Sequence, residues 1–229
     1  MNSPQLRRGL VDLGIRSPEV ADLLGRYLAE LDRWNARFGF VKATADELVA
    51  KHALDSIAGA ATVADLCAGG GVLDVGSGAG FPGIPLAIAL PEVRFCLLER
   101  SAKKCAFLEN CRALLGLANA AVLQADLSEA SGSFDVVTFR AVAPLGRFLA
   151  DLARSKVAWR SVAAYKGRRD RIEEELAALG PAARHAGIVR LEVPFVDEER
   201  HLVVLRNGTG IPVRGAGSPL NLDNTGGGD

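Results

Sequence analysis

The sequence has few of the features that mark disulfide-stabilised, metal-binding or membrane proteins. Its 229 residues include four cysteines, with no CxxC pair and no histidine at zinc-binding spacing from them. This favours free thiols in a reducing compartment and argues against a metal site. No apolar run reaches the roughly 20 residues that a membrane-spanning helix needs. A soluble, cytoplasmic protein is therefore expected.

The sequence also lacks net charge. Its 27 basic and 27 acidic side chains balance, so attraction to a polyanion would have to come from local clustering. One cluster lies at 140–169, where eight basic residues accompany a single acidic residue. A local excess of +7 favours an RNA partner whose phosphates it would contact. The alternative is an ordinary solvated surface.

The N-terminal part has the apolar periodicity of helices. Residues 18–38 place apolar side chains at steps of three and four, after Ser17 as a cap and Pro18 as the first helical residue. This pattern predicts a long amphipathic helix. The segment Thr44–Glu47 has a capping-box pattern and predicts the start of a second helix.

From residue 72 onward, short apolar runs alternate with helical patterns in units of about 25 to 30 residues, which predicts βαβ crossovers and a parallel sheet covered on both faces. The last two strands are separated by a short connection, so a hairpin and an antiparallel strand at the end of the sheet are expected. Predicted strands span 72–75, 93–99, 120–125, 134–139, 157–165, 185–193 and 201–206, and predicted helices span 82–90, 101–115, 144–155 and 168–179.

These patterns divide the chain into three segments. A helical segment at 1–66 is expected to pack on a main α/β domain at 67–206. The tail at 207–229 is rich in glycine, proline and asparagine, so it is expected to be mobile.

The stretch GSGAGFPG, from Gly76 to Gly83, has the composition of a ligand-binding loop. Read from Gly78 it spells GxGxxG, which is typical of dinucleotide sites, and read from Gly76 it spells GxGxG, which is common at S-adenosylmethionine sites. The first strand is expected to end at Val75, so the loop begins at Gly76 and places Phe81 where a dinucleotide motif needs its third glycine. The strand register therefore favours the second spelling, with a dinucleotide site or a plain turn as alternatives. The absence of a GK[ST] sequence excludes a P-loop.

Two acidic residues follow the next two strands. Glu99 lies 23 positions after Gly76 and can accept two hydrogen bonds from a ribose diol. It indicates a nucleoside without distinguishing NAD from S-adenosylmethionine. Asp126 follows the third predicted strand and can line an adenine, although it can equally cap a turn or a helix.

The stretch DVGSGAGFPGIPL, from Asp74 to Leu86, resembles the RsmG (GidB) family of bacterial 16S rRNA guanine-N7 methyltransferases. Its PGIPL extension separates this family from other class I methyltransferases. The resemblance covers about residues 25–206 and departs from the family at 39–41, where Gly-Phe-Val replaces the usual Asn-Leu-Thr. Further matches are RWN at 33–35, HALDS at 52–56, RAVA at 140–143, KG at 166–167 and ER at 199–200.

The resemblance implies a class I S-adenosylmethionine-dependent methyltransferase: an α/β, Rossmann-like fold with a seven-stranded, mostly parallel sheet behind a helical N-terminal segment. It also implies S-adenosyl-L-methionine as the methyl donor and 16S rRNA, free or in the 30S particle, as the substrate. A monomer that binds no membrane is expected. Together with the loop glycines and Asp126, it predicts a donor site made of Gly76, Ser77, Gly78, Gly80, Phe81, Glu99, Arg100, Ser101, Asp126, Leu127, Ser128 and Arg140.

Arg140 directly follows the fourth predicted strand, at the edge where open α/β sheets bind ligands. We predict it as the catalytic residue, in contact with the donor carboxylate, guanine O6 or a phosphate; a surface ion pair is the alternative. Guanine N7 already has a lone pair, so its methylation needs positioning rather than a general base. His52 and Asp55 share a helix face, and a structural pair is favoured for them. Predicted RNA-binding residues are Lys103, Lys104, Arg147, Lys166, Arg168 and Arg169.

Two other functions remain open on the sequence alone. A non-catalytic RNA- or ribosome-binding protein could retain a nucleoside-binding fold, and a small-molecule methyltransferase could use the same donor loop. The chain lacks the cysteine of a cytosine-C5 enzyme after the fourth strand, and RAVA at 140–143 replaces the Asn-Pro-Pro-aromatic motif of N6-adenine enzymes. These two enzyme classes are therefore disfavoured.

Overall fold

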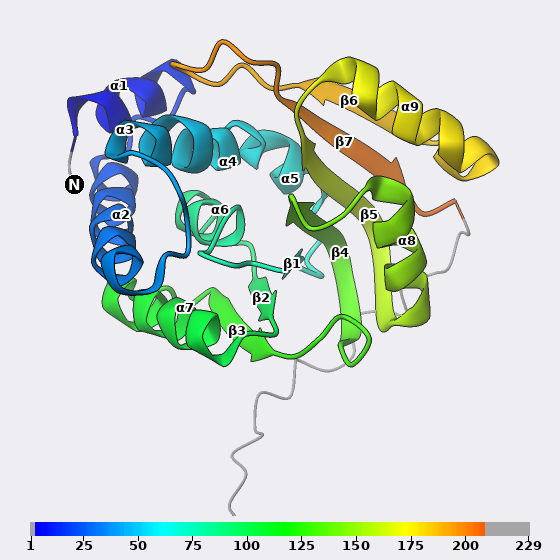
Figure 1. Ribbon diagram of the computed structural model, residues 1–229, viewed down its shortest axis with the longest axis horizontal. Coiled ribbons are helices and arrows are strands. Elements are labelled where there is room, and N and C mark those ends of the chain that lie inside the picture. Colours follow the sequence, from blue (N-terminus) through cyan, green and yellow to red (C-terminus); the bar gives the residue numbers. More distant parts are fainter. Residues whose placement is uncertain (1–2, 209–229) are drawn as a thin grey trace, which may run out of the picture.

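Short runs of buried apolar residues form the middle of a seven-stranded sheet (Figure 1). In the computed structural model, which describes residues 3–208, β1 (Val72–Val75) and β2 (Phe95–Glu99) are buried along their whole length. Most of the predicted tail, 209–229, lies outside the described residues. The other strands are β3 (Ala120–Gln124), β4 (Ser131–Arg140), β5 (Lys156–Lys166), β6 (Ala186–Arg190) and β7 (His201–Arg206).

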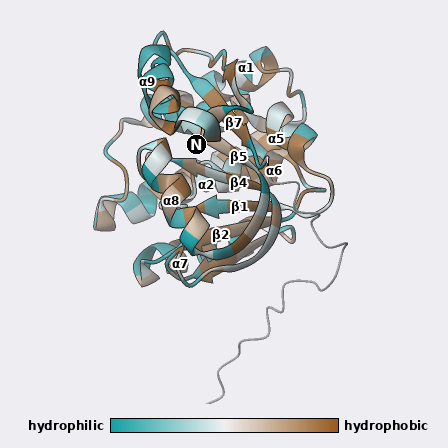
Figure 2. Ribbon diagram, turned by 90° about the vertical axis from the view of Figure 1, so that its right-hand side faces the viewer, coloured by the Kyte–Doolittle hydropathy of each residue, from teal (hydrophilic) through white to brown (hydrophobic). Residues whose placement is uncertain are grey.

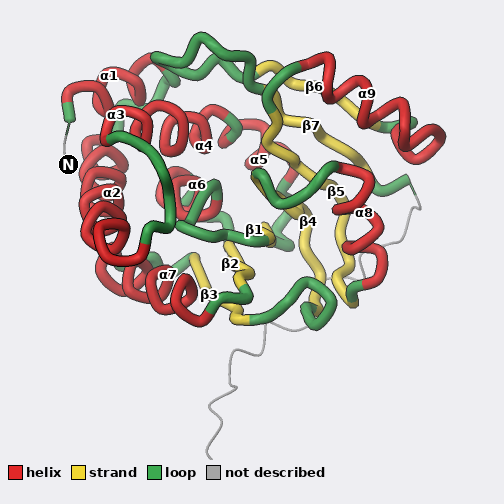
Figure 3. The backbone as a smooth tube through the Cα atoms, viewed as in Figure 1, coloured by secondary structure: helices red, strands yellow, loops and turns green. Residues whose placement is uncertain are grey.

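The strand order is β3-β2-β1-β4-β5-β7-β6, and β1 to β5 run parallel. Because β1 pairs with β2 on one side and with β4 on the other, the direction of the strand order reverses at β1. In open α/β sheets, ligands bind outside the carboxyl ends of the strands at such a switch point. Figure 3 traces the loops that leave β1 and β4 there.

The end of the sheet corrects one expectation. The predicted hairpin is present, since β6 pairs with β7 in antiparallel register. However, β7 also pairs antiparallel with β5, so the reversed strand lies between β5 and β6 and is not the edge strand. Strand β4 begins at Ser131, three residues before the predicted start, because pairing of 131–133 with β5 extends the ladder beyond the apolar run.

The two faces of the sheet are covered by different helices. Alternating strand residues point to opposite faces, so Val72 packs with the N-terminal helices, α6 (Gly83–Ala89) and α7 (Ala102–Leu115). Leu73 and Val75 pack with α8 (Leu145–Arg154) and α9 (Arg169–Leu179) on the other face. The outward side of α9 is largely hydrophilic, as Figure 2 shows in teal. A one-turn 3-10 helix, η2 (Gly180–Ala183), follows α9.

The helix predicted at 18–38 is present as α2 (Pro18–Phe38). The Ser17 side chain accepts a hydrogen bond from Val20 N at 3.3 Å, and the helix ends at Gly39 in the left-handed conformation with φ 63°. Helix α2 packs against the sheet through α6 and α7 and shares their apolar core. A shorter helix, α1 (Pro4–Asp12), precedes it.

The second N-terminal helical stretch contains a π-helical segment that the sequence did not predict. The capping box is present, because Thr44 and Glu47 exchange backbone and side-chain hydrogen bonds at 2.9 and 3.3 Å. The chain then continues as α3 (Ala45–Glu47), the π-helical η1 (Leu48–Leu54), α4 (Asp55–Ala58) and α5 (Ala60–Leu66). Segments of π-helix are rare and occur frequently at functional sites.

Three features of the described residues concern disulfides, metal binding and membrane insertion. The four cysteines are free, and three of them are buried. Among residues 3–208, no cluster of three or more potential metal ligands is present. Within the same described part of the chain, every helix is either too short or too polar to cross a membrane.

Candidate functional site

The glycine-rich loop begins directly after β1 and turns back over β2. Gly76 N and Ser77 N both donate hydrogen bonds to Leu98 O, at 2.8 and 3.0 Å. Gly80 has a φ of 97°, and a Cβ atom there would lie 2.7 Å from Ile84 Cδ1 and 2.9 Å from Tyr27 Oη. The backbone conformation and the close packing therefore both require glycine at this position.

Helix α2 holds the loop from outside the sheet. The buried Tyr27 donates its hydroxyl to Ala79 O at 2.5 Å, and its ring packs edge-to-face on Phe81, with centroids 5.4 Å apart. Burial raises the pKa of Tyr27 well above its usual value, so the hydroxyl remains a donor. The sequence analysis did not identify Tyr27. The one feature of the sequence that could have pointed to Tyr27 is a tyrosine at an apolar position of the helix, because a buried hydroxyl needs a hydrogen-bond partner.

Gly83 gives the overlapping GxGxxG spelling a structural meaning. A Cβ atom at Gly83 would lie 2.4 Å from Leu97 Cδ2 and 2.5 Å from Asp74 Oδ2. The start of α6 therefore packs directly on β1 and β2, which is the role of the third glycine in a dinucleotide motif. The expected start of the loop at Gly76 is observed, but close helix packing is supplied at Gly83 rather than being hindered by Phe81.

Asp74 lies buried beneath the loop and was also not predicted as a site residue. Its Oδ2 atom accepts a hydrogen bond from Gly83 N at 3.1 Å, whereas its Oδ1 atom is buried without a hydrogen-bond partner. Burial raises the pKa of Asp74 to about 7. A buried acceptor without a partner is a group that a ligand or water can satisfy.

Glu99 connects the loop to α7. Its Oε2 atom accepts from Gly78 N at 3.0 Å, and its Oε1 atom accepts from Ser101 N at 2.9 Å. The residue is only 6% exposed. Because each carboxylate oxygen has two lone pairs, both oxygens can still accept a hydroxyl of a ligand.

Asp126 adopts the capping arrangement that was the alternative to a ligand contact. Its Oδ1 atom accepts from Ser128 N at 3.0 Å and from Ser128 Oγ at 2.9 Å. These hydrogen bonds lower the pKa of the exposed Asp126 carboxyl. Leu127 packs against the apolar core on the α8 face, and Arg100 is exposed. The contribution of these four residues to a donor site stays a prediction.

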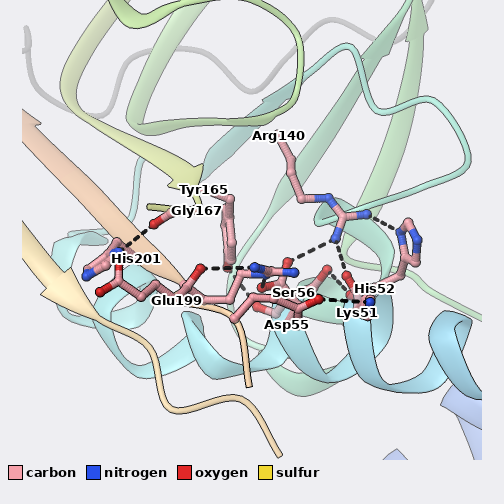
Figure 4. Close-up of polar contacts among 11 residues, drawn as sticks. Lys51, His52, Asp55, Ser56, Arg140, Tyr165, Gly167, Glu199 and His201 are labelled. Carbon is pink, nitrogen blue, oxygen red and sulfur yellow. Dashed lines mark hydrogen bonds and ion pairs between the residues drawn. The ribbon is translucent and has the colours of Figure 1, made fainter. Parts of the chain in front are cut away.

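The guanidinium of Arg140 is held by the π-helical segment η1 and by the first residue of α4 (Figure 4). Its Nη1 atom donates to Lys51 O at 3.2 Å and to Asp55 Oδ2 at 3.0 Å, and its Nη2 atom lies 2.8 Å from His52 Nδ1. The guanidinium carbon also lies 5.0 Å from the centroid of the Phe81 ring. Arg140 therefore joins the end of β4, the N-terminal helices and the glycine loop.

His52 and Asp55 are thus linked through Arg140 rather than to each other. Burial and the neighbouring Arg140 cation lower the pKa of His52 to about 4, so a neutral imidazole accepts the hydrogen bond from arginine. Burial raises the pKa of Asp55, and Arg140 partly offsets this effect. Arg200 Nε lies 3.4 Å from Asp55 Oδ1, which is an ion-pair distance without a hydrogen bond.

A second contact fixes the same helices to β5. Tyr165 donates its hydroxyl to Ser56 O at 2.7 Å, and Gly59 is close enough that a Cβ atom there would lie 2.4 Å from Tyr165 Oη. Figure 4 shows this tyrosine beside the Arg140 contacts. The helical segment that follows the capping box is therefore anchored to two adjacent strands, β4 and β5.

The His52 pKa predicts a pH dependence of stability. Between about pH 4 and pH 6.5 the unfolded chain binds a proton at His52 that the folded chain does not, so the stabilising contribution is complete above pH 6.5 and lost as the pH falls through 4. Relative to His52→Gln, which can still accept from Arg140, we expect the wild type to lose about 1 to 2 kcal/mol of unfolding free energy across this range.

Urea unfolding of both proteins at several pH values measures this difference. The comparison with His52→Gln cancels the opposite contribution of Asp74, whose raised pKa makes the folded state bind the extra proton. Parallel pH profiles of the two proteins would contradict the assignment.

The loop after β4 leans over the glycine loop. Ala141 has a φ of 55°, a left-handed conformation that is costly for alanine. It directs Val142 towards Gly76, where an added Cβ atom would lie 2.9 Å from Val142 Cγ2. Val142 nevertheless remains 45% exposed. The two loops thus meet at the switch point of the sheet, where the Val142 side chain contacts the glycine loop and is partly exposed to solvent.

The basic cluster at 140–169 is largely paired with acidic residues, which the sequence count did not include. That count ended one residue before Asp170, and Glu173, Glu174 and Glu175 follow. Lys166 Nζ lies 2.9 Å from Glu175 Oε2, and Arg169 Nε lies 2.8 Å from Glu173 Oε1. Arg168 pairs with Asp170, and Arg147 and Arg154 both pair with Asp151. Neighbouring carboxylates therefore offset part of the charge of this cluster, and its role in RNA binding stays a prediction.

Comparison with known proteins identifies relatives over most of the chain. The family model GidB, described as rRNA small subunit methyltransferase G, matches residues 21–203. The ribosomal RNA small subunit methyltransferase G of Cupriavidus necator is 39% identical over 217 residues, covering 88% of this chain and 93% of that protein. The protein of the same name from Methylococcus capsulatus is 42% identical over 207 residues, covering 88% and 97%. These matches confirm the resemblance predicted from residues 74–86.

Solved structures share the fold at lower identity. Magnesium protoporphyrin IX methyltransferase from Synechocystis, solved with bound SAM, gives a TM-score of 0.52 at 21% identity and covers 77% of this chain and 90% of its own. A human methyltransferase 10 domain containing protein gives 0.55 at 13% identity, with 83% and 98% covered. The predicted class I methyltransferase fold is therefore confirmed.

Proposed function

The chain belongs to the GidB family, rRNA small subunit methyltransferase G, and from this membership we propose that it transfers a methyl group from S-adenosylmethionine to N7 of a guanine in 16S rRNA. The observation that carries the proposal is the family match over 21–203, which includes the glycine loop, Glu99 and Arg140. The protein is an rRNA methyltransferase and uses S-adenosylmethionine as its donor.

The residues around the glycine loop fit this donor. The loop between Gly76 and Phe81 brings backbone close to the ligand space, Glu99 offers acceptor lone pairs for ribose hydroxyls, and Asp74 has a buried oxygen without a partner. Bound S-adenosylmethionine supplies a methyl group on a positively charged sulfur. We propose that Glu99 and the backbone of the loop bind the donor, while the side chains of Ser77 and Phe81, which are buried, maintain the loop.

Methyl transfer to guanine N7 requires the enzyme to position the base against the methyl group. N7 carries no proton and has an in-plane lone pair, so no side chain has to remove a proton before transfer. The neutral His52 is already engaged with Arg140, which agrees with a reaction that uses no histidine base. Val142, exposed beside Gly76, is placed to limit how a flat base approaches the loop and to exclude water from it.

For Arg140 we propose a positioning role in place of the predicted direct contact. Its hydrogen bonds to Lys51 and Asp55 and its stacking on Phe81 hold the N-terminal helices against the glycine loop. Loss of Arg140 would then impair methyl transfer by loosening the loop. A role in contacting guanine would instead require the guanidinium to leave these partners.

We further propose that the enzyme acts as a monomer in the cytoplasm, where ribosomal RNA is its substrate. Five large apolar side chains of residues 3–208 are exposed, and they are distributed over α1, α7, the loop after β4 and the β6–β7 hairpin. This scatter supports a monomer, because stable subunit interfaces are usually contiguous apolar patches.

Methyl transfer from radiolabelled S-adenosylmethionine to 30S particles and to naked 16S rRNA tests the proposed function. The expected result is label on a single guanine that becomes sensitive to cleavage at N7-methylated sites. The comparison of the two substrates also decides between the free RNA and the particle. Label on another base would overturn the N7 assignment, and transfer that persists without RNA would indicate a small-molecule methyltransferase.

A further inference from the structure

Among residues 3–208, five cations without a carboxylate at ion-pair distance lie near the end of α2 and the start of α7, two helices that pack together. They are Arg37, Lys42, Arg100, Lys103 and Lys104, called here the α2–α7 cation patch. We infer that this patch, rather than the basic cluster at 140–169, binds the phosphate backbone of the rRNA. The inference rests on the proposed function, since it names the surface by which the substrate is held.

The patch is built on a firm aromatic support. Lys103 Nζ lies 4.8 Å from the centroid of the Phe38 ring, and the guanidinium carbon of Arg37 lies 5.1 Å from the same ring. Phe107 of α7 packs against Trp34 and Phe40, with ring centroids 5.5 Å apart in both pairs. Rings that hold the charged side chains reduce the conformational entropy lost when they bind a ligand.

The loop that carries Lys42 is fixed as well. The Asn35 side chain accepts from Val41 N at 2.8 Å and donates to Val41 O at 2.7 Å. This pair of hydrogen bonds folds the chain after α2 back onto the end of the helix. The departure from the family sequence at 39–41 therefore leaves a defined loop, with Lys42 exposed next to it.

The patch adjoins the donor site through a few residues. Arg100 directly follows Glu99, and Ser101 N donates to Glu99 Oε1 at 2.9 Å. Lys103 and Lys104 lie in the first turn of α7, which carries no acidic residue. Phosphates bound here would thus lie near the carboxyl edge of β2, where a target base has to reach the donor.

The placement of these cations is unfavourable for the fold itself. Basic side chains in the first turn of a helix oppose its dipole and cost a few tenths of a kcal/mol each at an exposed surface. The acidic residues that offset such charges around α9 are missing at the start of α7. The Phe38 ring offsets part of this cost for Lys103, but no ion pair among residues 3–208 does, and cations kept at such a position indicate function.

The two basic surfaces differ in whether their cations already form ion pairs with acidic residues. Arg168 and Arg169 must share or release Asp170 and Glu173 before they bind a phosphate. Cations without an acidic partner lose only their own hydration when they contact a phosphate, and each contact releases a counterion. Lys103 is exposed and Lys104 is half-buried. RNA binding should therefore depend more on Lys103 and Lys104 than on Arg168 and Arg169.

Filter binding of the full-length protein to naked 16S rRNA over a range of KCl concentrations tests the inference. For Lys103→Ala/Lys104→Ala we expect about a tenfold rise in Kd and a decrease of about 2 in the slope of log K against log salt, one for each lost phosphate contact. The matched control is Arg184→Ala/Arg206→Ala, which removes two exposed cations near the opposite edge of the sheet. Its Kd should stay within about twofold of wild type.

Four results separate the possibilities. An unchanged Kd and salt slope for Lys103→Ala/Lys104→Ala would overturn the inference, as would a larger loss of affinity for Arg168→Ala/Arg169→Ala. Calorimetry with S-adenosylmethionine should give the same donor affinity for the Lys103→Ala/Lys104→Ala protein as for wild type. If the wild type binds rRNA through the patch but methylates no guanine, the proposed function fails while the binding surface stands.

Discussion

Replacing Glu99 with alanine is expected to weaken S-adenosylmethionine binding by roughly 1.5 to 3 kcal/mol, or about 10- to 150-fold in Kd. The reason is the loss of a carboxylate at the carboxyl end of β2, next to the loop, where it can accept hydrogen bonds from ribose hydroxyls. Isothermal titration calorimetry of the wild type and the variant measures the difference directly. An unchanged Kd would remove Glu99 from the donor site.

The same substitution also affects the empty site, so a second variant is needed. Glu99 accepts from Gly78 N and from Ser101 N, and alanine would leave both donors without this partner. Glu99→Gln keeps the shape and one acceptor oxygen, so it should retain more of the loop structure while lacking the charge. Thermal unfolding without donor separates loss of fold from loss of affinity. Glu92→Ala, an exposed carboxylate before the amino end of β2, is the matched control and should bind the donor normally.

Arg140→Ala is expected to lower the free energy of unfolding by about 3 kcal/mol, because it leaves the carboxylate of Asp55 buried without its hydrogen-bonded cation. The Asp55 side chain is 5% exposed, and Arg200, at 3.4 Å, replaces the lost partner only in part. Denaturant unfolding of the variant measures the change. Arg147→Ala breaks an exposed pair with Asp151 and should cost less than about 1 kcal/mol.

A double-mutant cycle tests whether the effect runs through the pair. Asp55→Ala and Arg140→Ala should be non-additive by about 1 to 3 kcal/mol, since each substitution removes the same interaction. Asp55→Ala should also reduce methyl transfer while Arg140 is intact, because the pair holds the start of α4 against β4. If only Arg140→Ala reduced transfer, with additive stabilities, Arg140 would be a contact to donor or guanine.

The strands and helices that were predicted correctly are those for which the local sequence pattern and the tertiary packing favour the same structure. Residues 18–38 formed α2 because apolar periodicity, the Ser17 cap and Pro18 all favour the same helix. Helix α6 begins at Gly83, one residue after the predicted start at 82, where proline is tolerated because it lies in the first helical turn. Two features had no local signal. The π-helical η1 has an ordinary helical composition, and the position of β7 between β5 and β6 depends on pairing between distant segments.

The positions of the glycine loop and of Glu99 were predicted as far as single elements determine them. The end of β1 fixed where the loop begins, and the end of β2 placed Glu99 beside it. Contacts between distant segments could not be read in the same way. Tyr27, 52 residues from Ala79, and Asp55, 85 residues from Arg140, came together only through the fold. The charge count at 140–169 overstated the local excess because it considered a window of sequence and omitted the carboxylates of α9.

The contacts that α2 and η1 make with the loop have a consequence for the order of folding. Phe81 lies between Tyr27 from the N-terminal helices and Arg140 from the end of β4, so the loop acquires its shape only after both have arrived. Contacts between segments so far apart in the chain close large loops. They form slowly, because the chain loses conformational entropy on closing the loop before the contact stabilises the fold. Folding of the sheet alone would yield an intermediate with an unformed loop. The chain should therefore gain its affinity for S-adenosylmethionine in a late step of folding, when the N-terminal helices dock.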